Sequence, residues 1–340
     1  MTKTYNIAVV GATSLVGEAI LDVLAKRKFP FGKVYALEYQ TDGEQDVDFG
    51  NKSLDVEELA GFDFSSVQIA LFAASEEIAA EYVPLAVAAG CVVIDDSTCF
   101  RYDDDVPLVV PEVNPQAIAQ YTQRGIIANP GSGVTQMLIV LKPLHDVATI
   151  TRINVATYQS VSGSGRAGVE ELAQQAAQLL NARPVEAKVY PKQIAFNLLP
   201  HIDVFLENGY TKEEMKMVWE TRKVMGLPGI QVNPTAVRVP VFFGHSEAVH
   251  IETESQLTAV EARRILGSTP GIIVMDEHVP GGYPTPVTDA VRNDAVYVGR
   301  IREDISCPAG LNLWVVADNV RRGAALNSVQ IAEVLIRDYL

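Results

Sequence analysis

Apolar runs alternate with segments of helical spacing along the first part of the chain. Five short apolar runs are typical of buried strands, at 6–11, 33–38, 67–74, 91–97 and 125–129. Between them, the segments 18–26 and 77–89 carry an apolar stripe each, which predicts helices. Strands that alternate with helices predict an α/β fold with a doubly wound parallel sheet. Ligands bind such sheets at the carboxyl ends of the strands.

Beyond residue 132 the pattern changes to longer segments with stronger alternation of apolar and polar positions. Strands are expected at 151–163, 236–244, 248–255 and 312–319, with a helix at 170–181. Longer strands between fewer helices predict an α+β domain whose sheet can face a partner subunit. The last segment, 324–339, has the stripe of an amphipathic helix that can return to the first domain.

Two domains follow from this change of pattern and from a length of 340 residues, which is enough for two hydrophobic cores. We expect the first domain to comprise residues 1–128 together with 317–340, and the second to comprise 129–316. The C-terminal helix then completes the first domain after the chain has built the second.

The chain carries a formal net charge of −15, with 42 Asp and Glu against 27 Lys and Arg. Such an acidic chain is a poor candidate for binding nucleic acid or an anionic membrane. No stretch has the length and hydropathy of a membrane-spanning helix, and the first residues enter a strand without the pattern of a signal peptide. Cys91, Cys99 and Cys307 have neither metal-site spacing nor a disulfide pattern, so we expect a cytoplasmic protein without a metal site.

A glycine-bounded turn, GATSLVG, follows the first predicted strand and opens the first predicted helix. Glycine at such a turn lets backbone N–H groups approach a pyrophosphate at the helix N-terminus. The spacing is not G-x-G-x-x-G, so a tight turn with nothing bound remains an alternative. The residues proposed to contact a dinucleotide are Gly11, Thr13, Ser14, Val16 and Gly17.

An acidic residue, Glu38, ends the second predicted strand. A carboxylate at this position of a dinucleotide fold hydrogen-bonds the 2′-hydroxyl of the adenosine ribose and repels a 2′-phosphate. The stretch EYQTDGEQDVD contains no Arg or Lys that could bind such a phosphate. Any dinucleotide is therefore expected to be NAD in preference to NADP, unless Glu38 is only a solvated charge at a strand end.

The stretch IIANPGSGVTQM, residues 126–137, joins a strand to a helix through Asn-Pro and two glycines that flank Ser132. Asn-Pro breaks the strand, and the small residues allow a sharp turn before a helix that is expected from Met137. A side chain in such a turn can stand at a helix N-terminus, where the helix dipole favours an anion. Ser132 is a nucleophile, the remnant of one, or only a turn residue; the local sequence leaves all three open.

Polar residues without a local motif are scattered over the rest of the chain. Arg101 follows the fourth predicted strand, near the ligand-facing edge of the sheet, although a surface salt bridge to Asp103, Asp104 or Asp105 is the simpler explanation.

A pair and a single residue stand out farther along the chain. Glu213 and Lys216 lie three residues apart on a predicted helix and share a face, where they can pair with each other. His245 follows a strand and a glycine, so it is either a general acid or base or a structural histidine. Nothing local joins these residues to one another.

Many motifs, in the same order along the whole chain, give the sequence its resemblance to the aspartate-semialdehyde dehydrogenase family. They include VVID, VPEVNP, TQMLIVLKPL, TYQSVSGSG, QIAFNLLPHID, YTKEEMK, RVPVFFGHSEAV and ADNVRRGAALN. The resemblance implies a Rossmann-like domain, an α+β dimerisation and catalytic domain, and a homodimer. It also implies the NAD(P)- and phosphate-dependent interconversion of aspartyl phosphate and aspartate semialdehyde, in the pathway to lysine, threonine and methionine.

The resemblance assigns roles to charged residues that the local sequence leaves unexplained. By position in the motifs, Arg101 and Lys216 would hold phosphate. Arg238 would bind the substrate carboxylate through its planar guanidinium, and Glu213 would bind the substrate amino group.

Three further roles follow in the same way from the family motifs. Gln159, in TYQSVSGSG, would orient the covalent intermediate, and His245 would transfer the proton. Asn319, in ADNVRRGAALN, would contact the cofactor.

The resemblance is incomplete at the nucleophile. The family pattern reads Asn-Pro-Asn-Cys-Ser-Thr, whereas residues 129–134 read Asn-Pro-Gly-Ser-Gly-Val, so Ser132 stands where the nucleophilic cysteine is expected. A thiol is readily shifted to the thiolate at a helix N-terminus, but a serine hydroxyl is far less acidic and needs an adjacent base.

The resemblance is also incomplete around the cofactor. The family's arginine and lysine for the 2′-phosphate are replaced by Gln40 and Glu44, and the serine before them by Glu38. The family's glycine pair after the third strand is replaced by Ser75 and Glu76, whose carboxylate can crowd the cofactor. The cofactor side and the nucleophile have thus changed, while the residues for an anionic substrate are kept.

Two classes of function are compatible with this sequence. The first is a weak or altered aspartate-semialdehyde dehydrogenase that uses NAD or NADP, with NAD favoured, and takes aspartate semialdehyde, aspartyl phosphate and phosphate. The second is a non-catalytic paralogue of the Usg-1 type, which binds an acidic amino acid or phosphate or pairs with an active subunit. The loss of the cysteine favours the second class, and the retained substrate residues permit both.

Overall fold

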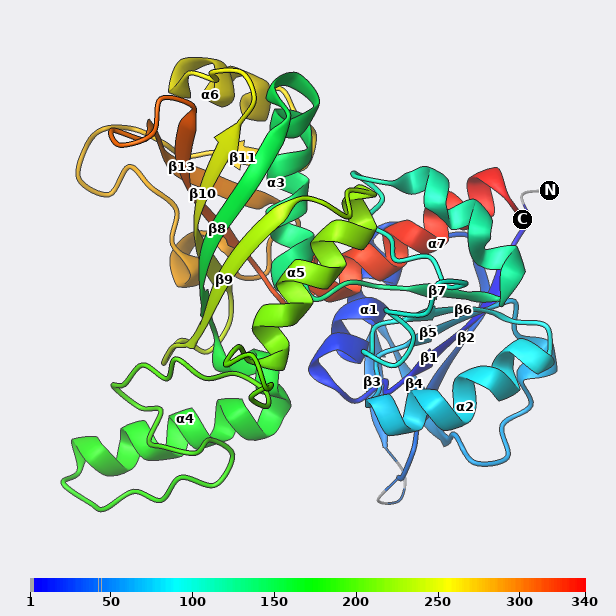
Figure 1. The fold of residues 1–340 in the computed structure, drawn as a ribbon. Helices are drawn as coiled ribbons and strands as arrows, with labels where there is room; N and C mark the ends of the chain where they lie inside the picture. The colour runs from blue at the N-terminus through cyan, green and yellow to red at the C-terminus, as the bar shows by residue number, and fades with distance from the viewer. Residues whose placement is uncertain (1–2, 42, 44) are drawn as a thin grey trace. The chain divides into compact units, whose positions relative to one another are not determined.

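The computed structural model of the chain describes residues 3–41, 43 and 45–340, which divide into two compact units (Figure 1). The first unit consists of Met1–Gly131 and Ala324–Leu340, and the second of Ser132–Gly323. The predicted domain bounds, 1–128 with 317–340 and 129–316, lie a few residues before both junctions.

A seven-stranded sheet forms the centre of the first unit, in the order β3-β4-β2-β1-β5-β6-β7. Its strands are β1 (Tyr5–Val10), β2 (Phe31–Glu38), β3 (Asp46–Phe49), β4 (Lys52–Glu58), β5 (Ile69–Phe72), β6 (Val92–Asp95) and β7 (Ile126–Ala128). Neighbouring strands are parallel except β3 and β4, which form an antiparallel hairpin at the edge. The predicted doubly wound sheet is confirmed. The hairpin was not predicted, because the acidic stretch after β2 contains too few apolar residues to show the alternation of a strand.

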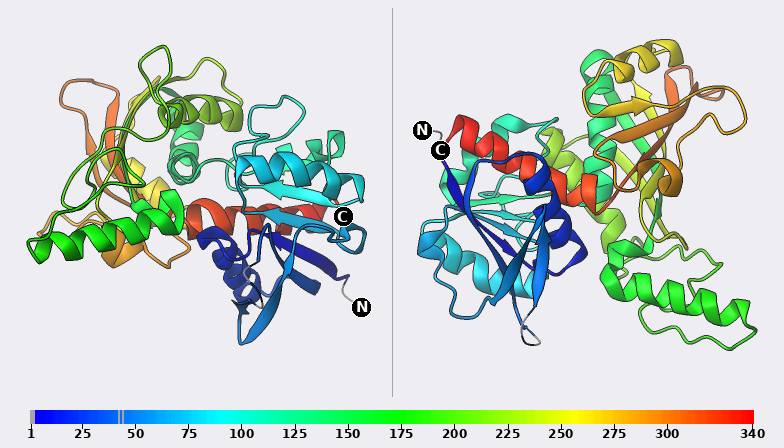
Figure 2. Two further views of the ribbon diagram at one scale, coloured as in Figure 1. Left: turned by 90° about the horizontal axis from the view of Figure 1, so that it is seen from below. Right: turned by 180° about the vertical axis from the view of Figure 1, so that it is seen from behind.

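Helices cover both faces of this sheet (Figure 2). They are α1 (Leu15–Lys26), α2 (Glu76–Ala88) and α7 (Leu326–Asp338), with a 3-10 helix at Pro115–Gln123. α1 and α7 share one hydrophobic cluster, which includes Ile20, Ile94 and Val329, so the predicted return of the C-terminal helix is confirmed. Right-handed crossovers that run in opposite directions from β1 and β5 place α1 and α2 on opposite faces. The carboxyl ends of β1 and β5 are therefore the switch point of the sheet, where dinucleotides bind.

A six-stranded mixed sheet forms the second unit, in the order β11-β12-β13-β10-β8-β9. Its strands are β8 (Ile150–Gln159), β9 (Gln231–Arg238), β10 (His245–Thr253), β11 (Ile272–Val274), β12 (Val296–Glu303) and β13 (Gly310–Ala317). The outer pairs, β8 with β9 and β11 with β12, are parallel, and the other pairs are antiparallel. The predicted α+β domain is confirmed.

The long helix α3 (Ser132–Ala148) packs on this sheet, together with α5 (Lys212–Met225) and α6 (Ala259–Gly267). Every residue of α3 from Gly133 to Leu141 is buried, as in a helix enclosed on all sides. The helix begins at Ser132 and not at Met137 as predicted, because its first turn is built from small and polar residues that lack an apolar period.

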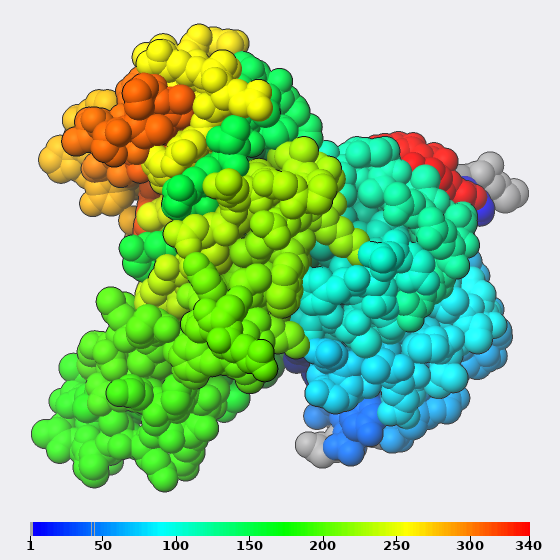
Figure 3. Space-filling view, in the orientation of Figure 1, coloured from blue at the N-terminus to red at the C-terminus, as the bar shows by residue number. Residues whose placement is uncertain are grey.

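The remaining helix, α4 (Gly165–Leu180), belongs to a separate part of the second unit. With the segment that follows it, α4 encloses a small hydrophobic cluster that includes Leu172, Ile194 and Leu199. This part forms a continuous lobe in the space-filling view, coloured green (Figure 3).

One predicted strand, 236–244, is wrong in its second half. β9 ends at Arg238, and the chain turns through Pro240 before β10 begins at His245. Gly244 has a φ of +89°, and a Cβ there would come 2.8 Å from the Cβ of Pro286, so only glycine fits. The apolar run that suggested a strand is therefore a turn between two strands, which places His245 at the start of one.

Two further findings concern membrane-spanning helices and metal-binding groups among the described residues. No helix among them is long and apolar enough to cross a bilayer. None of their histidine, cysteine, aspartate and glutamate side chains form a group suited to a metal ion.

Candidate functional site

The turn between β1 and α1 lies at the switch point of the first sheet. Gly11 has a φ of +76°, and a Cβ on Gly17 would come 2.0 Å from the Gly11 carbonyl oxygen, so both positions require glycine. Ser14 is the N-cap of α1: its Oγ accepts a hydrogen bond from the Gly17 N–H at 3.0 Å and donates to the Ala73 carbonyl at 3.2 Å. The turn is thus held against the end of β5, with the N-terminus of α1 beside it, as in turns that bind a pyrophosphate.

Glu38, at the end of β2, is directed at this turn. Its Oε2 accepts hydrogen bonds from the Thr13 hydroxyl at 2.6 Å and the Thr13 N–H at 3.2 Å, and its Oε1 accepts from the Tyr39 N–H at 3.1 Å. Glu38 is therefore not simply a solvated charge at the end of a strand. Gln40 is exposed, and Asp42 and Glu44 lie outside the described residues.

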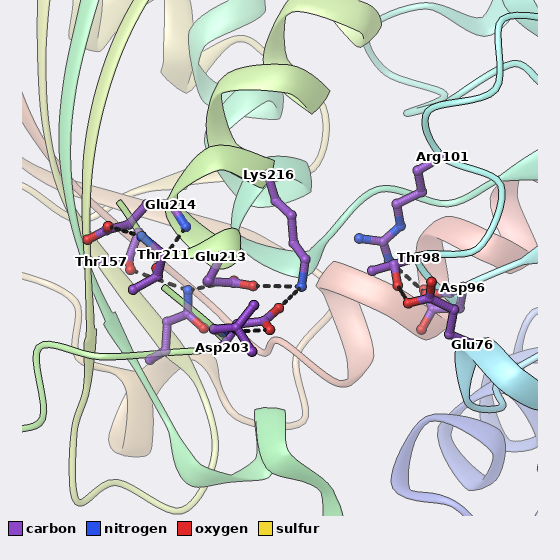
Figure 4. Close-up of polar contacts among 12 residues, drawn as sticks. Glu76, Asp96, Thr98, Arg101, Thr157, Asp203, Thr211, Glu213, Glu214 and Lys216 are labelled. Atoms are coloured by element: carbon purple, nitrogen blue, oxygen red, sulfur yellow. Dashed lines mark hydrogen bonds and ion pairs between the residues drawn. The ribbon is translucent and has the colours of Figure 1, made fainter. Parts of the chain in front are cut away.

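Ser75 and Glu76 start the helix that follows β5. Ser75 is the N-cap of α2, with its Oγ accepting from the Ile78 N–H at 3.4 Å. The Glu76 carboxylate accepts a hydrogen bond from the Thr98 hydroxyl (Figure 4). The substitution of the family's glycine pair therefore provides a helix cap and a link to the segment after β6, and crowding of a cofactor by Glu76 stays a prediction.

Arg101 is buried, with 6% of its surface exposed. Its Nη2 donates to the Asp96 carbonyl at 2.7 Å, in the segment that follows β6 (Figure 4). The carboxylates of Asp103 and Asp105, which the sequence offered as partners for Arg101, accept hydrogen bonds from Arg124. Arg101 is therefore not an exposed surface charge, and its convergence with the predicted residues of the second unit stays a prediction.

In the second unit, three predicted residues meet at one edge of the sheet. Gln159 ends β8 and Arg238 ends β9, and the register of these parallel strands pairs the two residues directly. His245 begins β10, which runs antiparallel to β8. The carboxyl end of a strand and the amino end of its antiparallel neighbour lie at the same edge, so residues far apart in sequence become neighbours.

A chain of polar contacts extends from this edge to α5 (Figure 4). The Gln159 amide donates to Glu213 Oε1 at 3.0 Å. The Lys216 ammonium contacts Glu213 Oε2 at 3.3 Å and Asp203 Oδ2 at 2.7 Å. The predicted pairing of Glu213 with Lys216 is present, and it is part of a larger group.

Asp203 is a member of this group that sequence reasoning missed. Burial raises the pKa of its carboxyl, but the hydrogen bonds from Lys216 and the Val204 N–H and the charges of Lys216 and Lys212 together outweigh burial, so the pKa lies below its ordinary value. Asp203 closes the motif QIAFNLLPHID, which was noted only for its resemblance. Its position in a family motif was the available indication, since Asp203 and Lys216 share no local pattern.

Arg238 and His245 are joined through the backbone of Ser160. Arg238 Nη1 donates to the Ser160 carbonyl at 2.7 Å, and the Ser160 N–H donates to His245 Nδ1 at 3.1 Å. Burial lowers the pKa of Arg238. Burial and then the positive charge of Arg238 lower the pKa of His245 well below its usual range, while the Gly244 backbone opposes this shift. The imidazole is therefore neutral beside a cationic guanidinium.

Asn319, which the resemblance assigned to the cofactor, is buried within the second unit. Its Oδ1 accepts hydrogen bonds from the Gly244 N–H at 3.0 Å and the Ser160 hydroxyl at 3.1 Å, and its Nδ2 donates to Ser162 Oγ at 3.0 Å. These contacts surround His245, and a contact of Asn319 with the cofactor stays a prediction.

Ser132 is the first residue of α3. A Cβ on Gly323 would come 2.3 Å from the Ser132 Cβ, so the bare Gly323 makes room for the Ser132 side chain. A Cβ on Gly133 would come 3.2 Å from Glu247 Oε1, so the first turn of α3 lies directly against a buried carboxyl group. The helix N-terminus around Ser132 is thus closely packed within the second unit.

Glu247, two residues after His245 on β10, has none of its surface exposed. Burial raises the pKa of its carboxyl well above the ordinary 4.5, although the nearby Gln136 amide opposes this shift. Among the described residues, neither carboxyl oxygen has a hydrogen bond of good geometry. The raised pKa favours the neutral, protonated form of Glu247 in the folded protein.

We expect Glu247→Gln to change how stability depends on pH. The folded protein holds a proton on Glu247 that the unfolded chain loses above about pH 4.5, so the free energy of unfolding falls by about 1.4 kcal/mol per pH unit from there up to the raised pKa. Glutamine does not titrate, so the free energy of unfolding of Glu247→Gln should rise with pH relative to that of the unchanged protein. Urea unfolding of both proteins between pH 5 and pH 8 measures the difference, and parallel pH curves would contradict a neutral Glu247.

The fold and the site together define a class of protein. A glycine turn at the switch point of a doubly wound sheet, beside an acidic residue at the end of β2, is typical of dinucleotide binding. A second unit that gathers a carboxamide, a guanidinium and an imidazole at one sheet edge adds groups suited to an anionic substrate and to proton transfer. This combination is that of a two-domain, nicotinamide-dependent oxidoreductase.

Comparisons with known proteins identify the family within this class. Residues 6–121 match the model of the semialdehyde dehydrogenase NAD binding domain, and residues 141–322 match that of the semialdehyde dehydrogenase dimerisation domain. The chain is 56% identical over 340 residues to an aspartate-semialdehyde dehydrogenase of Legionella pneumophila, covering all of this chain and 98% of that one. It is 54% identical over 339 residues to the aspartate-semialdehyde dehydrogenase of Shewanella sp. strain DB6705, covering all of both chains.

A solved structure gives the same result. The crystal structure of aspartate semialdehyde dehydrogenase II from Vibrio cholerae, complexed with ASA, matches with a TM-score of 0.97 and 53% identity over all of both chains. The chain belongs to the aspartate-semialdehyde dehydrogenase family, and the resemblance noted in the sequence is confirmed. Its first unit carries the family's NAD binding domain, and its second unit carries the dimerisation domain.

Proposed function

We propose that the protein catalyses the phosphate-dependent interconversion of aspartyl phosphate and aspartate semialdehyde, at a rate reduced by Ser132. The observation that carries the proposal is the polar edge of the second sheet, where Gln159, Arg238 and His245 lie together. The relatives named above bear the name of this activity. A phosphate-dependent assay with aspartate semialdehyde, run with NAD and with NADP, tests the proposal.

The charged residues of the second unit suit an amino-dicarboxylic substrate. Arg238 has a planar guanidinium that can bind a carboxylate through two hydrogen bonds, and its burial strengthens such a pair. Glu213 offers a carboxylate for the substrate amino group. Lys216 is proposed to supply positive charge for phosphate, and the resemblance assigns the same role to Arg101.

The remaining polar residues support the reaction itself. Gln159 is held by Glu213 and can orient the reacting group, and His245 transfers the proton. When bound, the nicotinamide supplies the hydride chemistry, and the residues proposed to hold its dinucleotide are those of the Gly11–Gly17 turn together with Glu38. The protein is further proposed to act as a cytoplasmic homodimer.

A second candidate function is favoured by one specific observation, the serine at the position of the nucleophilic cysteine. In this alternative the protein is a non-catalytic paralogue of the Usg-1 type, which binds an acidic amino acid or phosphate or pairs with an active subunit. The same assay separates the two functions, because a non-catalytic paralogue binds the substrate analogue without turnover.

Cofactor choice provides a prediction for the first unit. A 2′-phosphate would meet the Glu38 carboxylate, which is already directed at the turn by Thr13. Like charges a few ångströms apart cost on the order of a kcal/mol or more at intermediate dielectric. We therefore expect NAD to bind at least about tenfold more tightly than NADP, a gap of about 1.4 kcal/mol.

Titration of both dinucleotides into the unchanged protein and a Glu38→Ser, Gln40→Arg, Glu44→Lys variant measures this preference. The triple variant should shift the preference toward NADP, and Glu38→Gln serves as the control that removes only the charge. Tighter binding of NADP by the unchanged protein, or no shift in the triple variant, would contradict the assignment of Glu38.

A further inference from the structure

The ring of His245 is held from its Nδ1 side. The Ser160 N–H donates to Nδ1 at 3.1 Å, and His245 has only 2% of its surface exposed. A backbone amide nitrogen can donate a hydrogen bond but cannot accept one, so the ring nitrogen facing it must carry a lone pair. A neutral imidazole with a lone pair on Nδ1 has its proton on Nε2.

The Ser160 hydroxyl adds to this arrangement. Its Oγ lies 3.1 Å from His245 Nδ1 and also 3.1 Å from Asn319 Oδ1. The lone pair of Nδ1 is already engaged by the backbone N–H, so the hydroxyl proton is directed at Asn319 Oδ1 or at Ser162 Oγ, which lies 3.0 Å away. Ser160 thus links the imidazole to the carboxamide of Asn319.

Asn319 also contacts the residue that precedes His245 and the segment that follows β8. Its Oδ1 accepts from the N–H of Gly244, the residue before His245, at 3.0 Å. Because this N–H is also an obligate donor, the oxygen of the carboxamide faces it and the Nδ2 faces Ser162. One buried side chain therefore ties the start of β10 to the segment that follows β8.

Gly163 lies beside the opposite side of the ring. A Cβ on Gly163 would lie 3.6 Å from His245 Nε2 and 2.8 Å from Arg238 Nη1. Only glycine lets the backbone at residue 163 come this close to the guanidinium and the ring. An oxygen that gained negative charge beside Nε2 and the guanidinium would meet an N–H donor and a positive charge, the arrangement that stabilises an oxyanion.

We propose that Asn319 and Ser160 hold His245 as its neutral Nε2–H tautomer, so that the imidazole presents a hydrogen-bond donor to the substrate. Asn319 and Ser160 are then positioning residues, and neither needs to touch the substrate. The identity of the oxygen that receives the hydrogen bond rests on the proposed function, but the tautomer does not.

This arrangement has a consequence for Ser132. A serine hydroxyl needs a neighbouring base to become a nucleophile. In the protein before reaction, an imidazole whose Nε2 already carries the proton donates a hydrogen bond there and cannot accept the proton of Ser132. His245 therefore suits a thiolate nucleophile, which needs no base, better than it suits the hydroxyl of Ser132.

Nuclear magnetic resonance of protein labelled with ¹⁵N-histidine tests the proposal directly. Long-range ¹H–¹⁵N correlations distinguish a protonated ring nitrogen from one with a lone pair, and loss of one signal set in His245→Gln assigns the residue. At neutral pH we expect His245 to show a lone pair on Nδ1 and a proton on Nε2. The opposite tautomer, with Nδ1–H bonded to the Gly244 carbonyl, or a mixture of the two, would overturn the proposal.

Asn319→Ala and Asn319→Asp test the positioning residues. The alanine variant removes the acceptor for Gly244 and Ser160, so we expect a mixture of tautomers, whereas the aspartate variant keeps the acceptor and should keep the single tautomer. Asn181→Ala, at the exposed end of α4, is the matched control for losing an asparagine side chain. Circular dichroism and thermal unfolding check that each variant folds.

A cofactor titration of the same variants shows whether Asn319 also contacts the cofactor. We expect the His245 signals of Asn319→Ala to change whether or not its affinity for NAD changes. Weaker NAD binding with an unchanged tautomer would assign Asn319 to the cofactor and overturn its positioning role. Neither readout needs turnover, so absence of aspartate-semialdehyde dehydrogenase activity would leave this test intact.

Discussion

Turnover of aspartate semialdehyde in the presence of phosphate and NAD or NADP is expected to be at least about 10³-fold slower than in a relative that carries the cysteine, a difference of about 4 kcal/mol in activation free energy. The reason is chemical. A thiolate forms at the N-terminus of a helix because the dipole stabilises it, whereas a hydroxyl at the same place stays protonated without a base. An acyl-serine would also be an oxygen ester, which is a less reactive acceptor for phosphate than a thioester.

Ser132→Cys is the variant that measures how much of the loss is due to the nucleophile alone. We expect partial recovery, because the turn that leads into α3 also differs from the family pattern at Gly131, Gly133 and Val134. Gly133 lies against the Glu247 carboxyl, where the family pattern places a serine that could donate a hydrogen bond to it. A combined Ser132→Cys, Gly133→Ser variant should therefore recover more activity than Ser132→Cys.

Two outcomes would contradict this view of Ser132. The first is turnover by the unchanged protein at the rate of a cysteine-bearing relative, which would make Ser132 a competent nucleophile. The second is a burst of product from the unchanged protein that is lost in Ser132→Ala, which would show that an acyl-serine forms. We expect instead that Ser132→Ala and the unchanged protein have equal activity, since a hydroxyl without a base contributes little.

Removal of the buried guanidinium in Arg238→Ala is expected to weaken binding of an aspartate analogue by roughly 2–4 kcal/mol, because a charge-assisted fork onto the ligand carboxylate is lost. Arg238 is 5% exposed, and its Nη1 donates to the Ser160 carbonyl. A guanidinium has five N–H donors in a planar fork, so it can bind a ligand carboxylate as well. Isothermal titration calorimetry with the analogue measures the loss.

Two further variants make this measurement specific. Arg238→Lys keeps the charge but loses the planar fork, so its affinity should lie between those of Arg238→Ala and the unchanged protein. Arg264→Ala, on the exposed side of α6, removes an arginine away from the site and should bind the analogue normally. Unchanged affinity in Arg238→Ala would remove Arg238 from the carboxylate site, and this test holds for the catalytic and the non-catalytic function alike.

Several features of the protein could be predicted from local sequence because their causes are local. The alternation of apolar runs with striped segments led to the doubly wound sheet, and the glycines of GATSLVG marked a turn whose backbone geometry requires glycine at Gly11 and Gly17. The predictions failed where local pattern misleads. The apolar run after Arg238 is a turn between two strands, and the acidic stretch after Glu38 hides a hairpin.

The sequence by itself determined the class of fold, the family, the acidic end of β2 and the serine at Ser132, since each depends on which residue types follow one another. Only the tertiary structure decided which residues meet. Gln159, Arg238 and His245 come together because the register pairs β8 with β9 and the antiparallel β10 starts at the same edge. Asn319 joins His245, and Glu247 meets the first turn of α3, through contacts that cross between elements. Alternation along a strand specifies which face a side chain takes, but the neighbouring strand and its register depend on the whole chain.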